Sequence, residues 1–141
     1  MSYKIPIKHN KLFLSQFDFI LELVDDEFYQ YLDSIPAQYY FLNGGCVEFA
    51  KILKYYYPNG TFVIDQNKDH VAFLYENTIY DATGIVKEGK WNIVKNLDII
   101  ENTLGNTEIK FENKTPHIAI INEISQINPD YIKKISKVST K

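Results

Sequence analysis

The chain has 141 residues, of which 45% are hydrophobic, 15% aromatic and 23% charged, and its formal net charge is −3. This length fits one domain with a sizeable core, and the composition excludes a disordered, highly charged segment. The acidic balance argues against a protein that binds nucleic acid by neutralising phosphates, and no apolar run reaches the ~20 residues of a membrane span. We therefore expect a single domain over residues 1–141, located in the cytoplasm, that binds neither nucleic acid nor membrane.

An amphipathic helix is predicted from Ser15 to about Asp33. Its apolar residues recur at spacings of three and four, as a helix that buries one face requires; they are Phe17, Ile20, Leu21, Val24, Phe28 and Leu32. Pro36 closes the segment, because the residue before a proline is pushed out of the helical region. The acidic run from Asp25 to Glu27 is expected to be a solvated face rather than a cation site.

A second helix is predicted from Cys46 to about Tyr57, after a loop formed by Asn43, Gly44 and Gly45. One stripe of this helix is apolar and consists of Cys46, Phe49, Ala50, Leu53 and Tyr57. The polar residues Glu48, Lys51 and Lys54 are expected to face away from it. Turn residues at 58–60 then lead into a predicted strand over residues 61–65.

The clearest strand signal is a hairpin formed by residues 70–75 and 78–83 around the turn Glu76-Asn77. Farther along the chain, strands are predicted at residues 91–94, 109–111 and 118–121, and helices at residues 97–104 and 128–137. These elements predict the α+β class, with a helix packed on an antiparallel sheet and a further helix near each terminus.

Cys46 is the single cysteine of the sequence, so a disulfide within the chain and a Cys-rich zinc site are both excluded. A thiol in the first turn of a helix lies near unpaired backbone N–H groups and the positive end of the helix dipole, and both favour the thiolate. Gly44 and Gly45 carry no side chains, so a substrate backbone could approach the sulfur closely. The position of Cys46 therefore suits a nucleophile.

The hairpin supplies the other half of a catalytic site. With a turn at Glu76-Asn77, Ala72 lies opposite Asp81, and His70 and Asp81 are diagonal neighbours on one face. His70 is then the candidate general base and Asp81 the residue that orients its imidazole. For an oxyanion, the candidate donors are the backbone N–H of Cys46 and the side-chain amide of Asn43 or Gln38.

These segments resemble the papain-like cysteine peptidase superfamily, in its small bacterial and phage branches near the NlpC/P60 and transglutaminase-like groups. The residues that carry the resemblance are Asn-Gly-Gly-Cys-Val-Glu-Phe-Ala at residues 43–50, Asp-His-Val-Ala-Phe at 69–73 and Ile-Tyr-Asp-Ala-Thr-Gly at 79–84. It implies a papain-like core and a thiol mechanism for peptide hydrolysis, deamidation or acyl transfer. The implied substrate is an amide of a peptide, protein or peptidoglycan fragment, with no cofactor and no metal ion.

Other interpretations of the same residues stay open. Cys46 could be a small core hydrophobe, and His117 could replace His70 as the base. A mononuclear metal site built from Cys46, His70 and Asp81 is a further alternative. An alternative from a different class of function is a non-catalytic inhibitor, encoded by a phage or mobile element, that binds a host protein through its aromatic surface.

Overall fold

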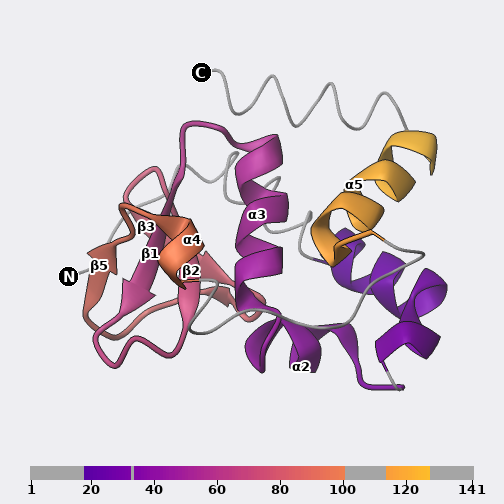
Figure 1. Cartoon of the computed structure of the whole chain (residues 1–141), viewed down its shortest axis with the longest axis horizontal. Coiled ribbons are helices and arrows are strands. Elements are labelled where there is room, and N and C mark those ends of the chain that lie inside the picture. The colour runs from indigo at the N-terminus through magenta and orange to yellow at the C-terminus, as the bar shows by residue number, and fades with distance from the viewer. Residues whose placement is uncertain (1–17, 33, 101–113, 128–141) are drawn as a thin grey trace.

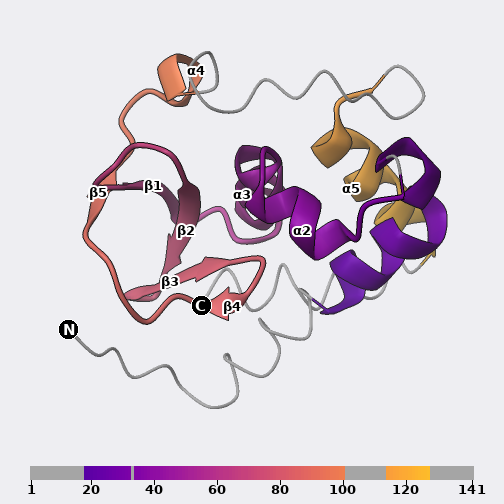
Figure 2. The ribbon, with the colours of Figure 1, turned by 90° about the horizontal axis from the view of Figure 1, so that it is seen from below.

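The fold is of the α+β class, as predicted. A computed structural model describes residues 18–32, 34–100 and 114–127. In Figure 1 an antiparallel sheet lies on one side of the helix α3 (Cys46–Tyr56), and most of the other helices lie on the opposite side. The view in Figure 2 shows the same order, with the strands curving round beside α3. The helix that carries Cys46 is therefore the central element of the domain.

The first described helix covers residues 18–27 and continues into a 3-10 turn, η1 (Tyr29–Leu32). This confirms the predicted helix where the structure describes it, while residues 15–17 and 33 lie outside the described residues. A short helix, α2 (Ala37–Leu42), follows Pro36 and was not predicted. Its N-terminus is capped from the preceding helix, because Asp25 Oδ1 accepts a hydrogen bond from the Ala37 N–H at 2.8 Å.

Among the described residues, the sheet contains five strands in the order β4-β3-β2-β1-β5, and all neighbouring pairs are antiparallel. Their bounds are β1 (Thr61–Asp65), β2 (Val71–Tyr75), β3 (Thr78–Asp81), β4 (Gly84–Ile85) and β5 (Trp91–Ile93). The predicted hairpin register is confirmed, since Tyr75 lies opposite Thr78 and Phe73 opposite Tyr80. Both turn residues have positive φ, 48° at Glu76 and 65° at Asn77, as a type I′ turn requires.

After the sheet, residues 94–100 and 114–127 contain the helices α4 (Leu97–Ile100) and α5 (Pro116–Ile127). The predicted buried strand at residues 118–121 is wrong, because these residues belong to α5. A short apolar run fits a buried strand and a buried helix equally well. In the helix, Ile120 and Ile124 point into the core, whereas Ile118 is 45% exposed. The elements predicted at 101–104, 109–111 and 128–137 lie outside the described residues.

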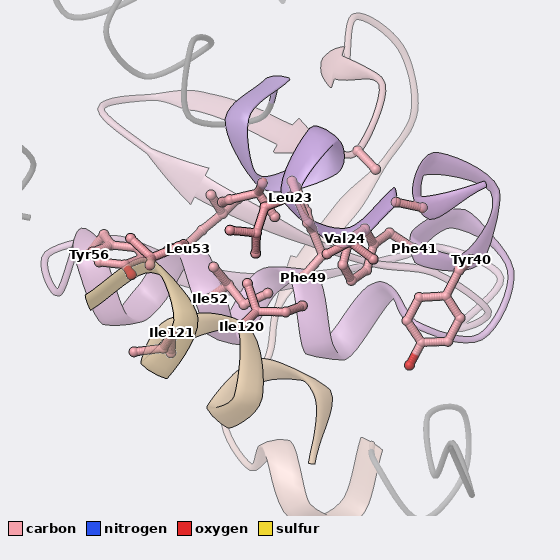
Figure 3. Close-up of a cluster of buried hydrophobic side chains, with 14 of the residues drawn as sticks. Leu23, Val24, Tyr40, Phe41, Phe49, Ile52, Leu53, Tyr56, Ile120 and Ile121 are labelled. Atoms are coloured by element: carbon pink, nitrogen blue, oxygen red, sulfur yellow. The ribbon is translucent and has the colours of Figure 1, made fainter. Parts of the chain in front are cut away.

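The main core lies between α3 and the helices around it. Figure 3 shows Phe49, Ile52 and Leu53 of α3 among side chains of the first helix, α2 and α5, such as Val24, Phe41 and Ile120. A second cluster surrounds the first turn of α3 and joins it to β1 and β2; it comprises Cys46, Val47, Ala50, Ile64 and Val71. This second cluster fixes the start of α3 against the sheet.

One expectation about α3 is wrong: Glu48 does not face solvent but is 6% exposed. Its Oε2 accepts a hydrogen bond from the His117 backbone N–H at 3.0 Å and a second from His117 Nδ1. Burial works to raise the pKa of Glu48, but the hydrogen bonds from His117 outweigh it and keep the pKa below its ordinary value. His117, the alternative base, is thus bound to Glu48 at the start of α5.

Candidate functional site

His70 and Asp81 form a hydrogen-bonded pair at the end of the hairpin. His70 precedes β2, Asp81 is the last residue of β3, and the His70 Nε2–Asp81 Oδ2 distance is 2.9 Å. Their side chains are 20% and 13% exposed. The other carboxylate oxygen, Asp81 Oδ1, accepts hydrogen bonds from the Thr83 N–H at 2.8 Å and from the Thr83 hydroxyl. Both oxygens are engaged, so the carboxylate is held in one orientation toward the imidazole.

Cys46 joins this pair from the first turn of α3. The residue is 5% exposed, and its thiol interacts electrostatically with the His70 imidazole. Because His70 Nε2 faces Asp81, Nδ1 is the ring nitrogen left for the sulfur. The structure thus brings together the three residues that the sequence analysis selected as nucleophile, base and orienting group.

The charges of the site favour a protonated imidazole. The hydrogen bond to Asp81, followed by the interaction with Cys46, outweighs burial and raises the pKa of His70 to about 10. For Asp81, burial works to raise the pKa, but the hydrogen bonds from His70 and Thr83 prevail and hold it below its ordinary value. At neutral pH the pair is therefore an imidazolium and a carboxylate, and the imidazolium lies next to the sulfur.

Two groups near His70 were not identified from the sequence. The Trp91 ring meets the imidazole nearly edge to face, with ring centroids 6.0 Å apart and an interplanar angle of 63°. The Asp65 carboxylate accepts hydrogen bonds from the backbone N–H groups of Asp69 and His70. Asp side chains commonly accept hydrogen bonds from backbone N–H groups a few residues farther along the chain. An Asp that ends a strand and precedes a loop, as Asp65 does, is therefore a sequence signal for such a contact.

The two candidate amide donors make different contacts. Gln38 Nε2 donates a hydrogen bond to the Ala82 carbonyl at 3.1 Å, so this side chain reaches the residue that follows Asp81. Asn43 Nδ2 donates to the Tyr39 carbonyl at 2.9 Å and is turned back onto α2. Each amide has a second N–H that these bonds do not use.

The two glycines before Cys46 also differ. Gly44 has a φ of +117°, and a Cβ added there would meet no atom within 4 Å, so this side of the backbone is open. A Cβ added to Gly45 would lie 2.6 Å from the Tyr40 ring. Gly45 is therefore needed for the packing of Tyr40. Gly44 is the glycine at which a substrate could come close to the backbone.

A cleft of about 380 Å³ borders the turn that follows Asp81. Its lining comes from the first helix, α2, the β3–β4 connection, β4 and the residues just after it, and consists of Asp18, Leu21, Gln38, Ala82, Thr83, Gly84, Ile85 and Lys87. Two of these residues, Gln38 and Thr83, also belong to the hydrogen bonds around Asp81 described above.

Within residues 18–32, 34–100 and 114–127, no three His, Cys, Asp or Glu side chains are arranged to hold a metal ion. The helices of the same ranges are each too short or too polar to cross a bilayer.

The chain matches the model of a known protein family. The family model of Phage YunG-like proteins matches residues 20–120, which include Cys46, His70 and Asp81. No curated protein and no solved structure matches the chain.

Proposed function

The chain belongs to the Phage YunG-like protein family, and we propose that it is a thiol-dependent hydrolase or acyltransferase acting on an amide bond. The substrate class is a peptide, a protein or a peptidoglycan fragment. The observation that carries the proposal is the 2.9 Å pair of His70 and Asp81, whose imidazole also interacts with the Cys46 thiol. Such a nucleophile, base and orienting group is the arrangement of covalent thiol catalysis.

In the first half of the reaction, the Cys46 sulfur attacks the amide carbonyl carbon and forms a C–S bond. The His70 imidazolium then gives its proton to the amide nitrogen as the C–N bond breaks, so the amine leaves neutral. In the second half, water or an amine attacks the thioester, His70 accepts the proton of the attacking group, and the thiolate departs. Asp81 keeps the imidazole in the orientation that both transfers need.

The negative oxygen of the intermediate needs hydrogen-bond donors. The helix α3 begins at Cys46, and its N-cap residue Gly45 provides no side-chain cap, so N–H groups of the first turn are available to an oxyanion. Gln38 is the better side-chain candidate, because its amide already reaches the Ala82 carbonyl beside Asp81, whereas Asn43 is turned toward Tyr39.

The test is the rate of Cys46 alkylation by iodoacetamide, followed by mass spectrometry as a function of pH. A thiolate next to an imidazolium reacts with iodoacetamide faster near pH ~6 than an ordinary cysteine thiol does. His70→Ala should slow the reaction at that pH, and Cys46→Ser should abolish it. A wild-type profile that follows an ordinary thiol, or labelling that requires denaturation, would contradict the proposal.

A second candidate function is a non-catalytic protein-binding module, such as a phage-associated inhibitor of a host protein. The observations that favour it are the 5% exposure of Cys46 and the exposed aromatic side chains Tyr29, Tyr39 and Tyr55. This function requires no reactive sulfur. Iodoacetamide labelling therefore separates the two candidates, and a biological effect that persists in folded His70→Ala would favour the binding module.

A further inference from the structure

His70 lies at the end of a loop rather than within a strand. The connection between β1 and β2 runs over residues 66–70, and residues 66–69 are exposed. Lys68 in this loop has a φ of 59°, an uncommon conformation for a residue with a side chain. Such a loop has little packing of its own. The position of the imidazole therefore depends on what holds the backbone at its end.

Asp65 forms hydrogen bonds to that backbone through both its side chain and its own main chain. Its Oδ1 accepts hydrogen bonds from the His70 N–H at 3.1 Å and from the Asp69 N–H at 2.8 Å. Its own backbone N–H donates to the His70 carbonyl at 3.0 Å, and its carbonyl accepts from the Lys68 N–H at 3.0 Å. Both polar backbone groups of His70 are thus bound to this one residue.

Asp65 is also connected to the aromatic ring that flanks the imidazole. It lies opposite Trp91 in the pairing of β1 with β5, and the Trp91 ring contacts the His70 ring at 6.0 Å between centroids. The last residue of β1 therefore sets the place of the His70 backbone and of the strand that presents Trp91. A displacement of Asp65 would move both.

The carboxylate of Asp65 suits this task. Burial works to raise its pKa, but the hydrogen bonds from Asp69 and His70 prevail and hold the pKa below its ordinary value. The group is ionised at neutral pH, so both oxygens of the side chain are acceptors and one of them is free to take both N–H bonds.

We propose that Asp65 is the positioning residue of the site, which holds His70 in register between Cys46 and Asp81 through bonds to the His70 backbone. Asp65 touches no substrate and transfers no proton. The inference rests on the proposed function, since it assigns a supporting residue to the same site. Its general basis is that a reacting group displaced by about 1 Å loses up to a hundredfold in rate.

The test separates the position of the acceptor oxygen from its charge. Asp65→Asn keeps a carbonyl oxygen in place and removes the charge, whereas Asp65→Glu keeps the charge and displaces the oxygen by one methylene. Positioning predicts iodoacetamide labelling of Cys46 near pH ~6 within about threefold of wild type for Asp65→Asn, and slower by about tenfold or more for Asp65→Glu and Asp65→Ala.

Asp25→Ala is the matched control, because Asp25 also accepts one backbone N–H at 2.8 Å, at α2, with no contact to His70. This variant should lose comparable stability and keep the wild-type labelling profile. Equal labelling in Asp65→Glu, Asp65→Ala and wild type would overturn the inference. So would the reverse order, with Asp65→Asn slow and Asp65→Glu normal, because the charge would then be what matters.

A second measurement keeps the inference distinct from the proposed function. NMR titration of the His70 imidazole reports its environment whether or not Cys46 reacts. If wild-type Cys46 labels as an ordinary thiol, the proposed function fails. In that event, an imidazole pKa that shifts toward its ordinary value in Asp65→Glu and stays in Asp65→Asn still supports positioning. Identical titrations in all variants would overturn it.

Discussion

The buried contact between Glu48 and His117 gives a stability prediction that can be worked out from the structure. The two side chains are 8% and 19% exposed, and the Glu48 Oε2 accepts hydrogen bonds from the His117 backbone N–H and ring. Glu48→Ala leaves both donors at the start of α5 without this acceptor. A buried donor left without a partner costs about 1–3 kcal/mol, and two donors of His117 are affected, so we expect a loss near ~3 kcal/mol.

Glu48→Gln should cost less, about 1–2 kcal/mol, because its carbonyl oxygen can still accept the backbone N–H. The control is Glu22→Ala, which removes the same charge from an exposed position and should change the free energy of unfolding by less than ~0.5 kcal/mol. Urea denaturation followed by circular dichroism near neutral pH measures all three, with the slope compared to exclude a change of the unfolded state.

The pH dependence of the free energy of unfolding tests the same contact. The pKa of Glu48 is lower in the folded protein than its ordinary value of 4.5, so its contribution is present above that value and is lost as the pH falls through the folded pKa. Glu48→Gln should lack this acid-dependent part of the stability. The reasoning is refuted if Glu48→Ala is as stable as Glu22→Ala.

Three further predictions concern the candidate site. The pKa of His70 is raised from 6.5 to about 10, so the contribution of His70 to stability is complete below pH 6.5 and is lost as the pH rises to about 10. The fluorescence of Trp91, the single tryptophan, should report this titration, and a midpoint near pH 6.5 would contradict the prediction. Gly45→Ala should lower the free energy of unfolding by about 1–3 kcal/mol, because the new Cβ would lie 2.6 Å from the Tyr40 ring, and a denaturation curve that matches wild type would show that the ring can move aside. Cys46→Ser should abolish labelling but change stability by less than ~1 kcal/mol, since the imidazole beside this position offers the new hydroxyl a polar partner. A melting temperature several degrees lower would instead indicate a core role.

The sequence was sufficient where local rules decide the structure. Glu76 and Asn77 fix the register of the hairpin, and the register places His70 and Asp81 on one face. The spacing of apolar residues locates α3 and hence Cys46 at its start. The pairing of His70 with Asp81 could therefore be predicted from parity, whereas the approach of Cys46 to this pair was implied by the family resemblance.

The sequence was insufficient where a distant partner decides the structure. Glu48 has the helical position of a solvent-facing residue, but His117, 69 residues away, makes its burial possible. The short helix α2 depends on a cap from Asp25, 12 residues upstream, and its own six residues carry no strong signal. Asp65 was recognised as a strand end, yet its hold on the His70 backbone needs the loop conformation.

The two-residue turn between β2 and β3 also bears on how the chain folds. His70 and Asp81 are 11 residues apart, so their contact closes a short loop and loses little chain entropy. Hairpins of this kind form in roughly 1–10 μs, whereas the contacts that seat Cys46 need α3 to dock on the finished sheet. The acid–base pair should therefore assemble before the thiol arrives. Mutations in the hairpin should slow folding, while mutations at the start of α3 should mainly speed unfolding.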